Sequence, residues 1–94
     1  MIYYVYLILS KKNNNYISYV GYSNNIKKRL ELHNKSKGAK FTKGRTWIVI
    51  YFKKYRNKTT AMKEEFKLKK NYKLRNKIKE AYLEKNENCN ITSF

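Results

Sequence analysis

Short apolar stretches alternate with polar, basic stretches along the chain, and this pattern predicts strands and helices in one small domain. Residues 2–9 are β-branched and aromatic almost throughout, which is typical of a strand buried on both faces. Residues 16–21 give a second strand after a polar turn over residues 10–15, so the two strands are expected to form a hairpin. A third strand is predicted over residues 46–55.

The turn over residues 10–15 also predicts the register of the hairpin. It places Leu9 opposite Tyr16 and therefore Tyr6 opposite Tyr19. Side chains of opposed residues lie on the same face of a sheet, so Tyr6 and Tyr19 are expected to share one face.

A helical pattern follows the second strand. Asn24 or Asn25 can cap a helix that runs to about Ser36. Its apolar stripe reaches His33, and Arg29 lies beside that stripe one turn earlier.

A second helical pattern follows the third strand, with Thr59 or Thr60 as its cap. Its stripe consists of Ala61, Glu65, Leu68 and Tyr72. A carboxylate within such a stripe is unusual, because burying a charge costs several kcal/mol unless the charge is paired. A break near residues 71–73 separates this helix from another that runs to about Glu84.

The predicted order is β-β-α-β-α-α, an α+β fold in which helices flank a small three-stranded antiparallel sheet. We expect residues 1–85 to form the domain and residues 86–94 to form a flexible tail.

Composition narrows the chemistry that the 94 residues can carry. All six acidic residues are glutamates, so aspartic dyads, Ser-His-Asp triads and EF-hand loops are excluded. A single cysteine and a single histidine exclude an internal disulfide and the common zinc sites. The spacing of the three glycines, Gly21, Gly38 and Gly44, allows neither a P-loop nor a dinucleotide-binding GxGxxG motif.

No apolar run is long enough to span a membrane, and residues 1–9 lack the basic start and cleavage site of a signal peptide. We therefore expect an intracellular protein without a membrane partner, cytoplasmic if the source is a prokaryote.

The formal charge of +17 points first to nucleic acid, because basic side chains that neutralise phosphates release counterions. Two alternatives would also explain the charge. The partner could be an anionic membrane, or the charge could reflect only a compositional drift toward lysine. Candidate phosphate contacts in the basic segment after the first helix are Lys35, Lys37, Lys40, Lys43 and Arg45. Phe41 or Trp47 could stack on bases there, and the alternative is a solvated loop. Lys70 and Lys73, with Lys77, form a second basic run expected to lie on one helical face.

Five short motifs occur in order along this pattern. They are Tyr4-Val5-Tyr6, Tyr19-Val20-Gly21, Arg29 eight residues later, His33 one turn after that, and Glu65 in the second helix. Together they resemble the GIY-YIG nuclease domain over residues 2–82. Tyr4 stands where the family usually has a glycine. The segment 38–45 is similar to the small stand-alone bacterial branch, while Trp47 is closer to the nuclease subunit of the eukaryotic structure-specific pair.

The resemblance implies a role for each of the matched residues. Glu65 would hold one Mg²⁺ or Mn²⁺ ion, and Tyr19 would take a proton from the attacking water. Tyr6 would orient the water or the base, and Arg29 would stabilise charge on the phosphoryl group. His33 would contact phosphate or assist proton transfer.

Each of these residues also has an ordinary structural reading. The tyrosines could be sheet aromatics, and Arg29 could belong to a solvated helix face. His33 could be purely structural, and Glu65 could simply pair with Lys69 at i+4.

The function expected from the resemblance is a divalent-metal-dependent endonuclease acting on DNA. Cleavage would be structure-directed or of low specificity, on branched or nicked DNA, and a partner protein could supply targeting. The alternatives are a non-catalytic nucleic-acid-binding protein with the same fold, and a basic protein that binds ribosomes or RNA.

Overall fold

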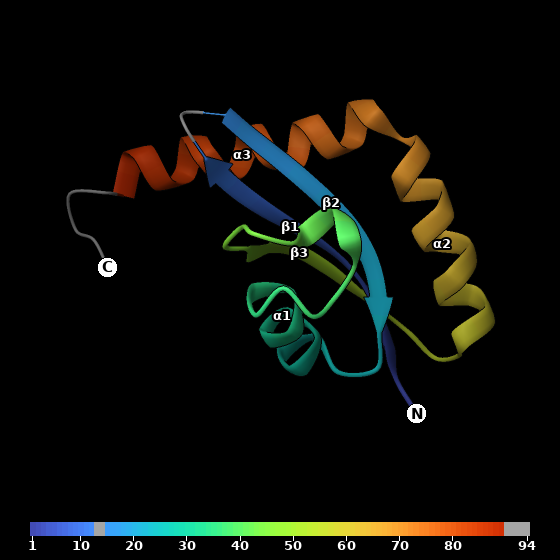
Figure 1. Cartoon of the computed structure of the whole chain (residues 1–94). Helices are drawn as coiled ribbons and strands as arrows, with labels where there is room; N and C mark the ends of the chain where they lie inside the picture. The colour runs from blue at the N-terminus through green and yellow to red at the C-terminus, as the bar shows by residue number, and fades with distance from the viewer. Residues whose placement is uncertain (13–14, 90–94) are drawn as a thin grey trace.

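The computed structural model describes residues 1–12 and 15–89, and its element order is the predicted β-β-α-β-α-α (Figure 1). The elements are β1 (Tyr3–Lys12), β2 (Asn15–Ser23), α1 (Ile26–Asn34), the short 3₁₀ helix η1 (Lys40–Thr42), β3 (Ile48–Tyr55), α2 (Lys58–Lys70) and α3 (Tyr72–Cys89).

The three strands form an antiparallel sheet in the order β2-β1-β3. The central strand β1 is buried from Val5 to Ser10, which confirms that its unbroken apolar run marks a strand covered on both faces. Its pairing with β3 shifts by one residue between Leu7 and Ile8, where a bulge interrupts the ladder.

The predicted hairpin register is wrong by two residues. Tyr6 faces Gly21 and Tyr19 faces Ile8, because both strands continue through the expected turn until Lys12 pairs with Asn15. A shift of two residues preserves the alternation of side chains, so Tyr6 and Tyr19 still lie on the same face.

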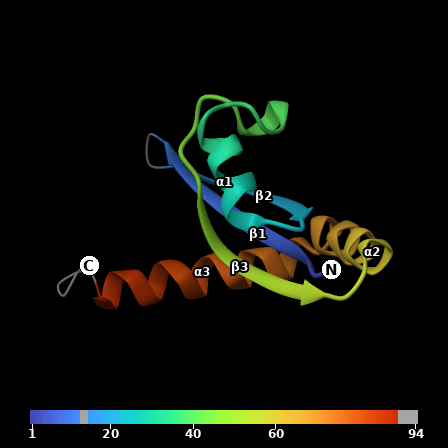
Figure 2. The same cartoon turned by 90° about the horizontal axis from the view of Figure 1, so that it is seen from below.

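Helices cover both faces of the sheet, as the two views of Figures 1 and 2 show. On one side α1 and η1 cover a core of Tyr6, Ile8 and Trp47. On the other side α2 and the start of α3 cover a core of Val5, Leu7, Val20, Ala61 and Leu68. The strand β2 lies at one edge of the sheet, where residues from both layers can meet.

Asparagine caps both of the first two helices. The Asn25 side chain accepts a hydrogen bond from the Lys28 amide at 3.0 Å, as one of the two predicted caps of α1. The cap of α2 is Asn57, which accepts from the Thr60 amide at 2.8 Å, so the predicted threonine caps are wrong. Asparagine is the stronger N-cap, and its position starts the helix two residues earlier.

The predicted break between the last two helices is confirmed, with Asn71 between α2 and α3. Because Tyr72 begins a new helix and is 65% exposed, it does not continue the buried stripe of α2 as predicted. For the same reason Lys70 and Lys73 lie on different helices, so the single basic face predicted for them is wrong.

The helix α3 ends at Cys89, beyond the predicted end near Glu84. Residues 90–94 of the predicted tail lie outside the described residues. Within the described ranges, no helix combines the length and the apolar character needed to cross a bilayer.

Candidate active site

A cleft of about 420 Å³ opens at the β2 edge of the sheet and draws its walls from four elements. Tyr6 comes from β1, Tyr19 from β2, Arg29 from α1 and Glu65 from α2. These are four of the five predicted catalytic residues, and the fold brings them to one place although they are spread over 60 residues of sequence.

Gly21 makes room for Tyr6 within this cleft. The two residues face each other across the hairpin, and a Cβ atom at position 21 would overlap the Tyr6 hydroxyl. The glycine of the second motif is therefore required by close approach of a side chain, rather than by an unusual backbone angle.

Tyr4, which replaces the usual glycine of the first motif, does not crowd the hairpin. It pairs with Ser23, and its ring meets Phe52 edge-on at 5.9 Å. The Tyr4 side chain lies beside β3 and the start of α1 and does not line this cleft.

His33 has no exposed surface and lies behind Tyr6. The Thr42 hydroxyl donates to the Ala39 carbonyl at 2.8 Å, so its oxygen must accept from His33 Nδ1, also at 2.8 Å. Nε2 then accepts from the Tyr6 hydroxyl at 2.9 Å. The network fixes the Nδ1–H tautomer. His33 does not line the cleft itself and is hydrogen-bonded to it through Tyr6, so direct contact with phosphate, one of its two predicted roles, is not available.

Burial holds both members of this pair in their neutral forms. It raises the pKa of Tyr6 to about 12, against the opposing effect of the Arg29 guanidinium. Burial also lowers the pKa of His33, and the positive charge of Arg29 acts in the same direction. At neutral pH the Tyr6 phenol therefore keeps its proton and donates it to an uncharged imidazole.

The lowered pKa of His33 predicts that acid destabilises the fold. Below a pH of about 6.5 the unfolded chain takes up a proton at His33 while the buried imidazole stays neutral, so the free energy of unfolding falls. His33→Gln, which cannot titrate, should show a smaller fall between pH 7 and pH 5. Urea unfolding followed by circular dichroism measures both slopes, and equal slopes would contradict the assignment.

Gly38 and Thr42 are the residues that hold His33, and neither was singled out as functional from the sequence. A Cβ atom at Gly38 would lie 2.5 Å from His33 Nδ1, so only glycine lets the loop pass over the imidazole. Both residues lie in the basic segment after the first helix, for which phosphate contacts or a solvated loop were the two interpretations, yet Thr42 is fully buried. The only signal in the sequence that could have indicated close packing there is the glycine at position 38, within a basic segment.

Arg29 faces the cleft with an unsatisfied donor. Its Nε is buried and has no hydrogen-bond partner among the described residues. A buried unpaired N–H is costly, and the anionic oxygens of carboxylates and phosphates are strong acceptors for a guanidinium. The helix α1, capped by Asn25, fixes the position from which Arg29 reaches the cleft.

Glu65 is the only carboxylate among the residues that line this cleft, and its side chain is 18% exposed. Its Oε1 lies 3.6 Å from Lys69 Nζ, so the i+4 pair named as its structural alternative is present as a loose contact. The described residues contain no group of three His, Cys, Asp or Glu side chains able to hold a metal. A single accessible carboxylate fits Mg²⁺, which keeps several waters and takes substrate oxygens as further ligands.

Tyr19 is surrounded by aromatic rings and one cation. Phe41 stacks on it at 5.8 Å between centroids, His33 meets it edge-on at 5.3 Å, and Lys69 Nζ lies 6.0 Å from its centroid. Trp47 is 1% exposed and donates to the Thr42 carbonyl, so the prediction that it could stack on bases is wrong. Phe41 remains available because it is 56% exposed.

The predicted phosphate contacts lie outside the cleft. Their four lysines in the segment after α1 (Lys35, Lys37, Lys40 and Lys43) are exposed, as are Lys70 and Lys73. Arg45 is half-buried, and its Nε donates to the Ser10 hydroxyl at 3.3 Å. This segment is therefore a basic surface built on an ordered η1 turn.

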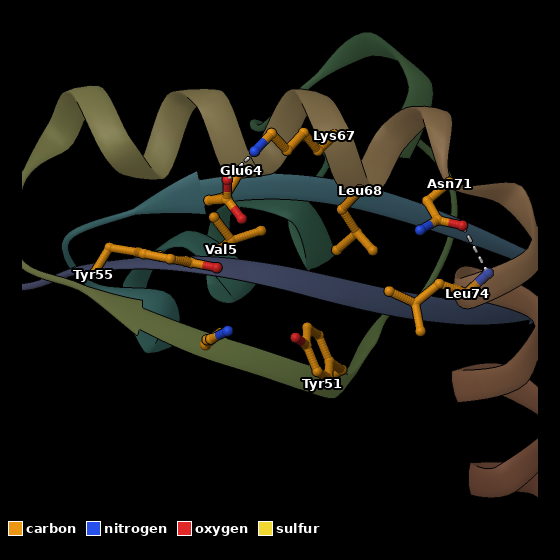
Figure 3. Close-up of a pocket in the computed structure, with 9 residues that line it drawn as sticks. Val5, Tyr51, Tyr55, Glu64, Lys67, Leu68, Asn71 and Leu74 are labelled. Atoms are coloured by element: carbon orange, nitrogen blue, oxygen red, sulfur yellow. Dashed lines mark hydrogen bonds and ion pairs between the residues drawn. The ribbon is translucent and has the colours of Figure 1, made fainter.

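A separate cavity of about 240 Å³ lies between β1, β3 and the two C-terminal helices (Figure 3). It contains the Glu64–Lys67 ion pair at 3.1 Å, and burial together with Glu64 raises the pKa of Tyr55. None of the predicted catalytic residues lines it, so Glu64 and Glu65, although adjacent in sequence, face different cavities.

Comparison with protein families matches residues 2–79 to the GIY-YIG catalytic domain. A UPF0213 protein of Oceanobacillus iheyensis is 43% identical over 67 residues, which cover 70% of this chain and 74% of the relative. One from Bacillus cereus is 43% identical over 70 residues (73% and 70%), and one from Clostridium perfringens is 38% identical over 68 residues (71% and 70%). No solved structure gives a significant match.

Proposed function

The chain belongs to the GIY-YIG family, and on that premise we propose that it is an endonuclease that hydrolyses DNA phosphodiester bonds with a divalent metal ion. The observation that carries the proposal is the convergence of Tyr6, Tyr19, Arg29 and Glu65 on one cleft. GIY-YIG domains are endonuclease domains and generally use divalent metal ions, and a chain of charge +17 suits a polyanionic substrate.

In the proposed reaction a water attacks the phosphorus while the bond to the leaving oxygen breaks. Tyr19 takes the proton from the attacking water, and the Lys69 ammonium lies 6.0 Å from the centroid of its ring. The leaving oxygen is protonated by solvent. Tyr6 cannot serve as the base at neutral pH, because its proton is held by burial and donated to His33.

Arg29 and Tyr6 would bind and orient the phosphate and the water. The unpaired Nε of Arg29 supplies a donor that meets charge as it develops on the phosphoryl oxygens. Tyr6 lines the cleft, its phenol oxygen can accept hydrogen bonds, and the His33–Thr42 network holds that oxygen in place.

Glu65 would hold the metal ion. When bound, a Mg²⁺ or Mn²⁺ ion supplies charge neutralisation to the phosphate and to the leaving oxygen. Glu65 is suited to this because its ion pair with Lys69 is long and partly solvated, so a cation of higher charge can displace it.

Cleavage of a supercoiled plasmid and of nicked and branched DNA, each with Mg²⁺, Mn²⁺ or EDTA, tests the proposal. We expect metal-dependent strand breaks, with branched or nicked DNA cut faster than intact duplex. Metal-independent cleavage that survives purification would point to a contaminant. Salt-sensitive binding without cleavage in any metal would favour the non-catalytic nucleic-acid-binding alternative.

The basic segment after α1 is proposed to hold the DNA backbone beside the cleft. Lys40→Glu combined with Lys43→Glu should weaken DNA binding and lower the slope of log affinity against log salt by about 2, because two phosphate contacts are lost. Fluorescence anisotropy over a salt series measures the slope. Lys53→Glu with Lys54→Glu on β3 gives a matched change of charge, and equal effects of the two pairs would remove the segment from the binding path.

A further inference from the structure

A smaller cleft of about 250 Å³ adjoins the catalytic one and shares Tyr19 with it. Its walls come from β2, η1, α2 and α3, which meet only in the folded protein. The lining residues are Ser18, Tyr19, Val20, Phe41, Lys69 and Arg75. They include two cations and two aromatic rings and no acid.

Arg75 lines this cleft and carries one donor without a partner. Its Nη1 donates to the Ser18 hydroxyl at 3.5 Å, and its guanidinium lies 5.7 Å from the Tyr72 centroid. Its Nε is buried and makes no hydrogen bond within the described part of the chain. The guanidinium is thus held in place from two sides while one N–H lacks an acceptor, which a phosphate oxygen would supply.

Phe41 supplies an aromatic platform next to this cation. One side of its ring is stacked on Tyr19, and more than half of the side chain remains exposed. The short helix η1 is tied to the core through Thr42 and Trp47, so Phe41 is presented from a fixed backbone. Exposed aromatic rings beside cations are the means by which proteins bind unpaired nucleotides, by stacking and phosphate contact together.

We propose that this cleft binds the nucleotide next to the cleaved bond, with its base stacked on Phe41 and its phosphate held by Arg75 and Lys69. The inference rests on the proposed function, because the shared wall at Tyr19 places the cleft beside the site of cleavage. In intact duplex both faces of each base are covered by neighbouring bases. The cleft therefore selects DNA with an unpaired strand beside the cut, such as a flap or a single-stranded gap.

The first test measures binding by fluorescence anisotropy in EDTA, so that no cleavage occurs. A labelled flap DNA should bind the wild-type protein more tightly than a duplex with the same number of phosphates. Phe41→Ala should weaken flap binding at least about 5-fold and duplex binding much less. Phe41→Trp should retain the preference, and Phe52→Ala, which truncates a similarly exposed phenylalanine outside the cleft, should leave both affinities unchanged.

The second test addresses the phosphate contact. Arg75→Gln should weaken flap binding and lower its salt slope by about 1, with a smaller effect on duplex. Arg56→Gln removes the same charge from an exposed position outside the cleft and serves as the control. Thermal unfolding of each variant confirms that the fold is retained.

Equal affinities of the wild-type protein for flap and duplex would overturn the proposal, as would equal losses on both DNAs in Phe41→Ala. Because these assays contain no metal, they are independent of the nuclease activity. A flap preference that depends on Phe41, in a protein that cleaves no DNA in any metal, would contradict the proposed function and leave the cleft as a site for unpaired DNA.

Discussion

Arg29→Ala should lower the rate of DNA cleavage about 10³-fold without loss of stability. The side chain faces the cleft, and its buried Nε lacks a partner in the described structure, so the fold loses no hydrogen bond from that atom when the side chain is removed. What is lost is a donor aimed at charge that develops in the transition state, and such groups contribute about 10²–10³ or more in rate. Single-turnover cleavage of branched DNA with Mg²⁺ measures the effect.

Two further variants separate this role from a general loss of charge. Lys28→Ala removes a neighbouring exposed cation from α1 and should change the rate only slightly. Arg29→Lys keeps the charge but loses the planar fork and should recover a small part of the activity. A rate for Arg29→Ala within about 10-fold of wild type would remove the residue from the mechanism.

Glu65→Gln should abolish metal-dependent cleavage, again by about 10³-fold or more. The change preserves shape but removes the one carboxylate of the cleft, and a bound metal ion contributes several kcal/mol to stabilising charge in the transition state. DNA binding in EDTA should be retained or slightly stronger, because a negative charge is lost. Cleavage assays, together with calorimetric titration of Mn²⁺ in the presence of DNA, follow both effects.

The matched control is Glu64→Gln, which makes the same chemical change one residue earlier. Glu64 pairs with Lys67 in the separate cavity between the sheet and the C-terminal helices, so this variant should cleave normally (Figure 3). Equal activities of the two variants would show that the metal, if required, is held elsewhere.

Arg29→Ala and Glu65→Gln together also distinguish the nuclease from a non-catalytic DNA-binding protein. A non-catalytic DNA-binding protein would show no metal-dependent cleavage before any substitution, and Glu65→Gln would then affect only binding. If the wild-type protein cleaves DNA and both Arg29→Ala and Glu65→Gln lose this activity, the proposed site is the catalytic one.

Predictions based on local patterns agree with the structure where one short segment decides the outcome. The apolar run of β1, the Asn25 cap and the break at Asn71 depend on neighbouring residues alone, and all three are found. The predicted hairpin register is wrong because strand pairing is decided across two segments. The first strand continues three residues beyond its predicted end, and the second begins one residue before its predicted start. The predicted cap of α2 is also wrong. Thr59 and Thr60 were favoured, but Asn57 lies close by in sequence and caps the helix.

In the candidate site, too, some features could be predicted from the sequence and others depend on the tertiary structure. The resemblance to the GIY-YIG domain pointed to Tyr6, Tyr19, Arg29 and Glu65, and the structure places them around one cleft. The His33–Thr42 network behind Tyr6 was not predicted, because Gly38 and Thr42 acquire their roles only when the loop folds over His33. The adjoining cleft likewise depends on Arg75, which lies more than 50 residues from Ser18 in sequence.

The sequence by itself determined the fold class, the basic character of the surface and which side chains could carry the chemistry. Periodicity, capping and composition are local or additive properties, so they can be read without coordinates. Only the tertiary structure decided which titratable groups are buried, which hydrogen bonds fix the His33 tautomer, and which donors of Arg29 and Arg75 are left unpaired. Burial and hydrogen bonding depend on what packs around a group, and most of those neighbours are remote in sequence.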